Sequence, residues 1–129
     1  MTSLLLDTLT MLWFVWDDPQ LSSSARAMIE DPNHRKLASI ASCREIAIKV
    51  GLGKLNIGEP SRPFLNREIT RNNVELLPIS LDHATLVEGL PPSHKDPFDR
   101  LLVAQADFEN LPLVSVDPIF DRYGITRMW

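Results

Sequence analysis

Two aspartates follow short apolar segments near opposite ends of the chain. Asp7 comes directly after residues 3–6, and Asp117 comes directly after residues 113–116. The carboxyl ends of parallel strands form the crevice in which ligands bind, so two strands that end in an acid favour a binding site there. For each acid alone, a turn residue or a helix N-cap is the more common explanation.

Asp99 belongs to a predicted helix over residues 97–108. Its side of that helix is otherwise apolar, since the residues three, four and seven positions further on are Leu102, Val103 and Ala106. Desolvating a lone carboxylate is costly unless it is paired or binds a metal, which favours a functional role. The alternative is a helix cap, with Asp96 as N-cap and Asp99 in the first turn, where the helix dipole favours acids. The sequence leaves both explanations of Asp99 open.

Glu45 lies in a predicted helix that has Ser42 as its N-cap and ends at about Leu52. This helix is apolar on most sides, and Ile48 and Leu52 share the face of Glu45. The pattern predicts a largely buried helix, in which the acid needs a partner. An i,i+4 surface pair with Lys49 is the simpler explanation when Glu45 is considered alone.

Taken together, these acids predict a metal site at the carboxyl edge of a parallel sheet. Several carboxylates in one cleft repel one another unless a cation balances their charge. Mg²⁺ or Mn²⁺ takes oxygen ligands and keeps waters in its shell, which suits such a site. The chemistry it supports is phosphodiester hydrolysis, because the cation activates water for attack on phosphorus and stabilises charge on the leaving oxygen. The four acids are Asp7, Glu45, Asp99 and Asp117.

The elements that must position these acids alternate along the chain. Short apolar segments predict strands and longer amphipathic segments predict helices, which is the pattern of βα units. Strands are expected at about 3–6, 36–40, 75–79, 113–116 and 125–128, the last at an edge. Helices are expected at about 8–16, 22–29, 42–52, 63–70, 82–88 and 97–108, with a loop over 90–95. This order predicts an α/β fold with a mainly parallel sheet of four or five strands, covered by helices on both faces.

Composition narrows the class of protein further. The chain has 129 residues and a net charge of −4, which suits one domain over residues 1–129 and argues against indiscriminate binding of polyanions. The single cysteine, Cys43, excludes an internal disulfide and a cysteine-based zinc site and fits a reducing compartment. The longest apolar run, residues 11–16, is far too short to span a membrane. We therefore expect a cytoplasmic protein without membrane attachment.

Several segments match a known family in order and spacing. The most specific is His94-Lys95-Asp96-Pro97-Phe98-Asp99-Arg100 with its continuation to residue 106. With these segments the chain resembles the PIN-domain ribonuclease toxins of the VapC type nearly from end to end. It departs from the family pattern at Leu9 and Arg44, where histidine and tryptophan are frequent, and neither departure removes a proposed ligand. The other matching segments are residues 5–8, 12–13, 42, 45–49, 53–55, 113–117, 120, 123–124 and 129.

The resemblance implies a three-layer α/β/α sandwich and a metal-dependent endoribonuclease that acts as a toxin. It also implies Mg²⁺ or Mn²⁺ as cofactor, an RNA substrate, a cognate antitoxin that blocks the site, and a homodimer. Its metal ligands correspond here to Asp7, Glu45, Asp99 and Asp117. The further candidates are Asp96 as an additional ligand, Thr8 and Ser115 as hydrogen-bonding neighbours of the acids, and Lys95 and Arg100 as contacts for RNA phosphates. The alternative function is a PIN-like module that binds RNA or protein without cutting.

Overall fold

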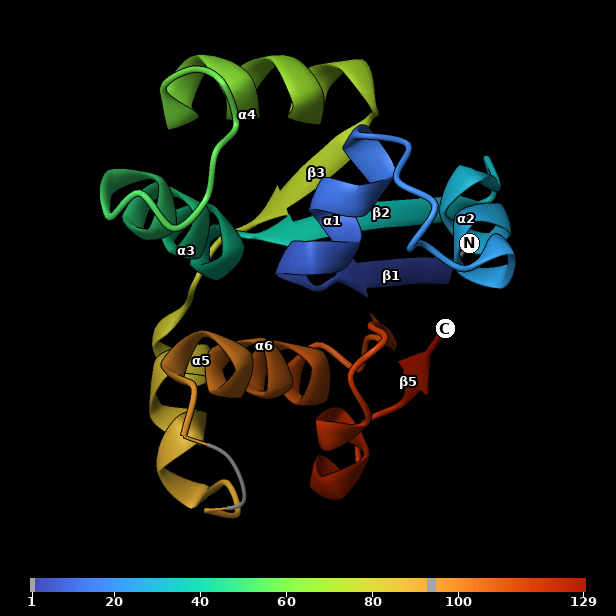
Figure 1. The fold of residues 1–129 in the computed structure, drawn as a ribbon. Coiled ribbons are helices and arrows are strands. Elements are labelled where there is room, and N and C mark those ends of the chain that lie inside the picture. Colours follow the sequence, from blue (N-terminus) through green and yellow to red (C-terminus); the bar gives the residue numbers. More distant parts are fainter. Residues whose placement is uncertain (1, 93–94) are drawn as a thin grey trace.

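Residues 2–92 and 95–129 are described by a computed structural model, in which they form one sheet of five parallel strands with helices on both faces (Figure 1). The order across the sheet is β3-β2-β1-β4-β5. The predicted α/β/α architecture with a parallel sheet is therefore confirmed. The strands are β1 (Thr2–Leu6), β2 (His34–Ser39), β3 (Val74–Leu77), β4 (Leu113–Val114) and β5 (Arg127–Met128).

The helices divide into two layers according to the core that they cover. Helices α1 to α4 contribute buried side chains to one hydrophobic cluster, and α6 and η2 contribute to a second cluster on the other face. Figure 1 shows α1, α2 and α4 on one side of the sheet and α5 and α6 on the other. The bounds are α1 (Thr8–Val15), α2 (Ser23–Glu30), α3 (Ile40–Gly51), α4 (Ser61–Arg71), α5 (Leu81–Leu86), η1 (Val87–Gly89), α6 (Pro97–Phe108) and η2 (Pro118–Tyr123).

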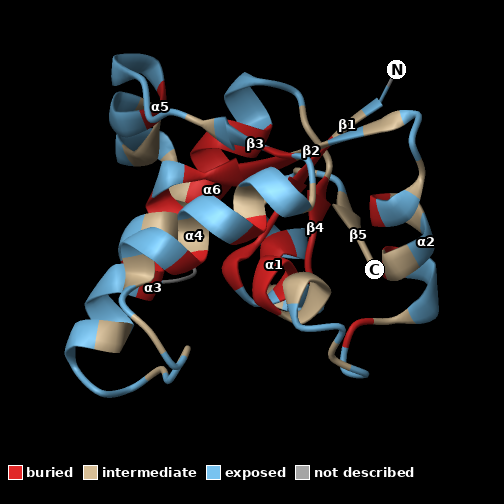
Figure 2. Cartoon of the chain, turned by 90° about the horizontal axis from the view of Figure 1, so that it is seen from above, coloured by how far each residue is buried: buried red, intermediate tan, exposed pale blue. Residues whose placement is uncertain are grey.

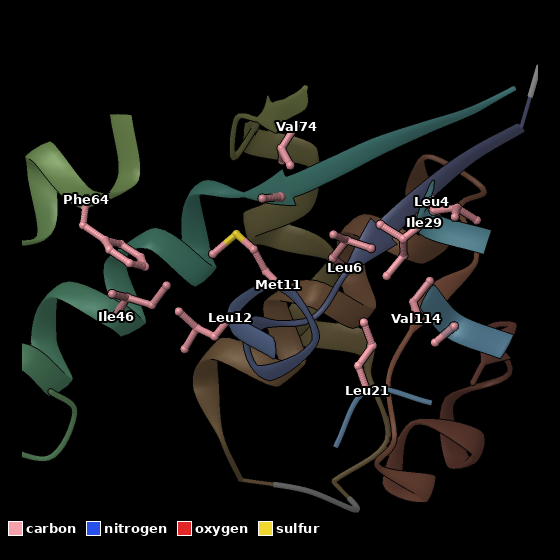
Figure 3. Packing of buried hydrophobic residues seen from close by; sticks show 12 residues of the cluster. Leu4, Leu6, Met11, Leu12, Leu21, Ile29, Ile46, Phe64, Val74 and Val114 are labelled. Carbon is pink, nitrogen blue, oxygen red and sulfur yellow. The ribbon is translucent and has the colours of Figure 1, made fainter. Parts of the chain in front are cut away.

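The central strand β1 is buried on both faces, as its continuous apolar sequence predicts. Leu4 and Leu6 point into the cluster shared with α1 to α4 (Figure 3), whereas Leu5 points into the cluster beneath α6. Each of these leucines is at most 1% exposed, and burying such a side chain contributes roughly 1.5–3 kcal/mol. Burial increases toward the carboxyl ends of β1 and β2, and β4 is buried throughout (Figure 2). Asp7, which follows β1, and Asp117, which follows β4, are therefore attached to well-packed strand ends.

The start of α3 differs from the sequence prediction. Ser39, and not Ser42, is the N-cap, and its hydroxyl accepts a hydrogen bond from the backbone N–H of Ala41 at 2.9 Å. β2 ends at Ser39, so this serine is the residue in extended conformation when the helix begins, which is what an N-cap requires. Ser42 lies inside the first turn and is 1% exposed.

The burial of α3 was also predicted wrongly. Ile48 and Leu52 are 37% and 64% exposed, because the fully buried residues of the helix end at Ile46 and Val50 beyond it packs only partly against the core. Its buried residues are Ala41, Ser42, Glu45 and Ile46. A near-uniform apolar pattern does not reveal which side of a helix faces the sheet, and here the polar Glu45 points inward.

The other predicted elements are found apart from shifts of their ends, whereas η2 was not predicted. β4 stops at Val114, so Asp117 follows the strand after two further residues instead of directly. The predicted loop over 90–95 has no helix or strand in its described residues, and positions 93 and 94 lie outside them. Within residues 2–92 and 95–129, no helix is long and apolar enough to cross a membrane.

Candidate functional site

A cleft of about 430 Å³ opens at the carboxyl edge of the sheet. β1 pairs with β4, with Leu6 opposite Val114, so the segments that leave these two strands lie side by side. α3 follows β2 at the same edge, and the start of α6 completes the cleft. In the described part of the chain, five carboxylates and one ammonium group line it. The lining residues are Asp7, Thr8, Leu9, Glu45, Lys49, Asp96, Asp99, Val116, Asp117, Pro118 and Phe120.

Asp7 is both a helix cap and a member of the cleft. Its carboxylate accepts a hydrogen bond from the backbone N–H of Thr10 at 2.7 Å, which makes it the N-cap of α1. The residue is only 7% exposed. Burial raises the pKa of the Asp7 carboxyl above its ordinary value; hydrogen bonds from Ser115 and Thr10 oppose that rise, and the charge of Glu45 adds to it. A buried carboxylate of this kind is stabilised by a cation.

Glu45 is held from two sides by hydrogen bonds. Its Oε1 accepts from the hydroxyl of Thr8 at 2.7 Å, and its Oε2 accepts from the Lys49 ammonium at 2.6 Å. The Thr8 hydroxyl also lies 2.9 Å from that of Ser42. Both explanations of Glu45 are therefore correct, because the i,i+4 pair with Lys49 exists and the acid is a buried residue of the cleft at 6% exposure.

Lys49, the i,i+4 partner of Glu45 considered from sequence, also belongs to the cleft lining. The hydrogen bond to Glu45 raises the pKa of the Lys49 ammonium; partial burial opposes this, and the charges of Glu45, Asp96 and Asp99 reinforce it. The spacing in the sequence indicates this position of Lys49. Ser42, Glu45 and Lys49 are separated by three and four residues, so they share one face of α3.

Asp96 and Asp99 mark the start of α6. The Asp96 carboxylate accepts from the backbone N–H groups of Phe98 at 2.9 Å and Asp99 at 3.1 Å, so the predicted N-cap is confirmed. Asp99 is partly buried above Leu102, which is itself fully buried. Asp99 thus heads the buried side of the helix, and both acids reach the cleft.

Ser115 connects the two strand-end aspartates. Its hydroxyl hydrogen-bonds to the Asp7 carboxylate and accepts from the backbone N–H of Asp117 at 3.1 Å. Ser115 is fully buried, whereas Asp117 is exposed and caps η2 by accepting from the N–H of Ile119 at 3.0 Å. The helix-cap explanation therefore holds for Asp117 as well, and its side chain still borders the cleft.

The candidate phosphate contacts lie elsewhere. The Arg100 guanidinium donates to the backbone carbonyls of Pro91 at 2.8 Å and Val87 at 3.2 Å, so it ties the segment before α6 to the helix. Lys95 is exposed next to Asp96. Neither residue belongs to the described lining of the cleft. His94, at the start of the most specific family segment, lies outside the described residues.

The donor set of the cleft fits a hard divalent cation in kind, because all its candidate ligands are carboxylate oxygens that line one cavity. As the side chains lie, no three His, Cys, Asp or Glu residues within 2–92 and 95–129 form a group that could hold an ion. Both oxygens of Glu45 are engaged, one by Thr8 and one by Lys49. Coordination would therefore require side-chain rearrangement, which is open to the exposed Asp117 and to the half-exposed Lys49.

The family model for the PIN domain matches residues 4–125. A comparison with curated proteins finds no match.

Solved structures of similar fold cover nearly the whole chain. One is VapBC2 from Rickettsia felis, bound to a DNA fragment from its promoter. It is 18% identical with a TM-score of 0.73, and the match covers 98% of both chains. DNA-bound VapBC from Salmonella typhimurium is 21% identical with a TM-score of 0.72, over 99% of this chain and 98% of that one. A toxin–antitoxin complex from Klebsiella pneumoniae is 17% identical with a TM-score of 0.58, and the match covers 89% of this chain and 87% of that one. At these identities, the likeness concerns the fold.

Proposed function

Since the chain belongs to the PIN domain family, we propose that it is a Mg²⁺- or Mn²⁺-dependent endoribonuclease that hydrolyses RNA phosphodiester bonds. We further propose that it serves as the toxin of a toxin–antitoxin pair. The observation that carries the proposal is the convergence of five carboxylates from four separate segments on one cleft. The five are Asp7, Glu45, Asp96, Asp99 and Asp117.

Four of these acids would hold the cation: Asp7, Glu45, Asp99 and Asp117. A bound divalent cation activates water toward phosphorus and stabilises the charge that develops on the leaving oxygen. The chain's own hydroxyl groups orient the ligands, since Thr8 binds Glu45 and Ser115 binds Asp7. Partners of this kind set the direction and basicity of a ligand, and losing one typically lowers affinity or activity about 10–100-fold.

Asp96 has a separate part in this arrangement. One of its carboxylate oxygens accepts both hydrogen bonds of the α6 cap, so its first task is to start the helix that carries Asp99. Its charge adds to the negative potential of the cleft, which attracts cations. We assign it to positioning and to the electrostatic field, and not to the ligand set.

The partner that we propose is a cognate antitoxin that covers the cleft. Leu9 and Val116 border the acids and are 50% and 41% exposed. An acidic cleft with apolar side chains at its border fits a protein segment that presents a basic side chain flanked by apolar anchors. The fold shared with the toxin–antitoxin complex from Klebsiella pneumoniae supports this type of partner. The homodimer and the cytoplasmic location stay predictions.

Cleavage of a labelled RNA by the purified protein tests the proposal. We expect cleavage with Mg²⁺ or Mn²⁺, none with a chelator present, and none by Asp7→Asn purified in the same way. Asp107→Asn is the matched control, because Asp107 is exposed on α6 outside the cleft lining. Cleavage that survives Asp7→Asn unchanged would refute the assignment.

A second measurement separates the nuclease from a binding module that does not cut. A cation that binds only the folded state stabilises it by RT ln(1 + c/Kd), where c is the cation concentration, so the thermal midpoint rises with the logarithm of that concentration once it exceeds the Kd. We expect Mn²⁺ to raise the midpoint of the wild type and of Asp107→Asn, and to have little effect on Asp7→Asn. A binding module without a metal site shows no such shift in any of the three proteins.

A further inference from the structure

Lys49 places a positive charge where the proposed cation must bind. Its ammonium group lies 2.6 Å from Oε2 of Glu45. The side chain of Glu45 is 8% exposed and that of Lys49 is 47% exposed, so the pair joins the inside of the cleft to solvent. In the described part of the chain, Lys49 is the cationic residue of the cleft lining.

The two hydrogen bonds of Glu45 have different consequences for a cation. The bond from Thr8 to Oε1 comes from a neutral hydroxyl, which can stay in place and orient a ligating carboxylate. The bond to Oε2 comes from an ammonium group, and a second cation at that oxygen would meet like-charge repulsion at short distance. Glu45 therefore cannot offer Oε2 to a cation while Lys49 remains bound to it.

Lys49 can leave Glu45 without disturbing the fold. It is near the end of α3, in the half of the helix that leaves Ile48 and Leu52 exposed to solvent. Its ammonium is a strongly hydrated charge on a flexible four-carbon stem, so a rotation of the side chain returns the charge to water. An ion pair with one half-exposed partner is weak enough to open in this way.

We propose that Lys49 is a tethered counter-ion, which neutralises Glu45 in the metal-free protein and must be displaced from that carboxylate when a divalent cation binds. The proposal rests on the metal site of the proposed function. The lysine lowers the repulsion among the cleft carboxylates while no cation is bound, and it weakens cation binding by competing for the same oxygen. The affinity of the cleft for Mg²⁺ or Mn²⁺ then depends on the replacement of the Lys49 ammonium by the cation at Glu45, and not on the acids alone.

Calorimetric titration of Mn²⁺ into Lys49→Met tests the competition. Methionine keeps most of the apolar stem and removes the charge. We expect Lys49→Met to bind Mn²⁺ about two- to fivefold more tightly than the wild type, the range that corresponds to a partly exposed ion pair. Lys54→Met is the matched control, since Lys54 is exposed beyond the end of α3 and outside the cleft lining, and the substitution changes the net charge by the same amount. Equal or weaker binding by Lys49→Met, or the same gain in Lys54→Met, overturns the proposal.

The displacement itself is visible in the unmodified protein by NMR of the lysine ammonium groups. The hydrogen-bonded ammonium of Lys49 should give a signal distinct from that of Lys54, and saturating Mg²⁺ should move it to the position of an exposed lysine. A Lys49 signal that stays unchanged at saturation contradicts displacement while leaving the nuclease assignment intact. Failure of both the wild type and Lys49→Met to bind any Mn²⁺ removes the metal site, and with it the proposed function.

Discussion

The hydroxyl of Thr8 lies 2.7 Å from Oε1 of Glu45 and so joins α1 to α3 across 37 positions of the sequence. Thr8 follows the strand-end acid Asp7, and Glu45 is the buried acid of the neighbouring helix. One neutral hydrogen bond therefore sets the direction of Glu45 toward the cleft, whether or not Lys49 is bound to its other oxygen. This relationship makes Thr8 the first residue to test.

We expect Thr8→Val to reduce Mn²⁺ affinity and RNA cleavage about 10–100-fold, because Glu45 loses the group that orients it. Valine has nearly the same shape, so the fold should be retained. Thr85→Val is the control: it also removes a threonine hydroxyl that donates to a backbone carbonyl, that of Leu81 at 2.9 Å, and Thr85 lies outside the lining of the cleft. Calorimetry and a cleavage assay on both variants check this, and equal loss in the two would contradict an orienting role.

The buried charge of Asp7 should reduce the stability of the metal-free protein. Its pKa is raised in the folded state, chiefly by burial, so the folded protein binds this proton more tightly than the unfolded chain does. The stability contributed by the protonated Asp7 is fully present below the ordinary carboxyl pKa and is lost as the pH rises through the raised value. Asp7→Asn should therefore raise the free energy of unfolding at neutral pH, since asparagine also caps helices well.

Urea denaturation in the presence of a chelator measures this effect. We expect the gain from Asp7→Asn to shrink to nothing as the pH is lowered below the ordinary carboxyl pKa, where Asp7 is neutral in both states. Asp107→Asn, at an exposed position, provides the reference. A gain that is the same at every pH would show that the charge of Asp7 is not its source.

We expect the main role of Asp96 to be capping α6 and not binding the cation. Asp96→Ala removes the acceptor for two N–H groups at the start of α6, and we expect it to lower the free energy of unfolding by about 1 kcal/mol. Asp96→Asn keeps the acceptor and should lose little stability. Because Asp96→Asn removes one charge from the cleft without removing a ligand, it should weaken Mn²⁺ binding less than Asp99→Asn does. The opposite order would make Asp96 a ligand.

Arg100 should contribute to stability and not to RNA binding. Its guanidinium donates to the carbonyls of Pro91 and Val87, and hydrogen bonds from a charged group contribute about 1.5–3 kcal/mol when they are well formed. We expect Arg100→Gln to lower the thermal midpoint and to leave the Kd for RNA unchanged. Fluorescence anisotropy with a labelled RNA in the Asp7→Asn background measures this Kd without cleavage, and a clear loss of affinity would restore Arg100 as a phosphate contact.

Local patterns were sufficient for much of the framework. The apolar runs at β1 and β4 and the Asp96-Pro97 start of α6 each depend on residues that are close in sequence, so they were predictable. The start of α3 was misplaced because two serines, Ser39 and Ser42, occur near it, and the one that caps is decided by where β2 stops pairing with its neighbours. The exposure of Ile48 and Leu52 was missed for a related reason, since periodicity shows that a helix has an apolar side but not how far the sheet extends beneath it.

The sequence by itself determined which acids follow strands and begin helices, because strand and helix signals are local and a parallel sheet places all its carboxyl ends at one edge. Only the tertiary structure decided which groups of other helices and strands each acid touches. The bonds of Glu45 to Thr8 and of Ser115 to Asp7, and the electrostatic influence of Asp96 and Asp99 on the Lys49 ammonium, connect residues far apart in the chain. Such contacts depend on the packing of α1, α3, α6 and β4 around one cleft, and side-chain packing at that distance has no signature in sequence spacing.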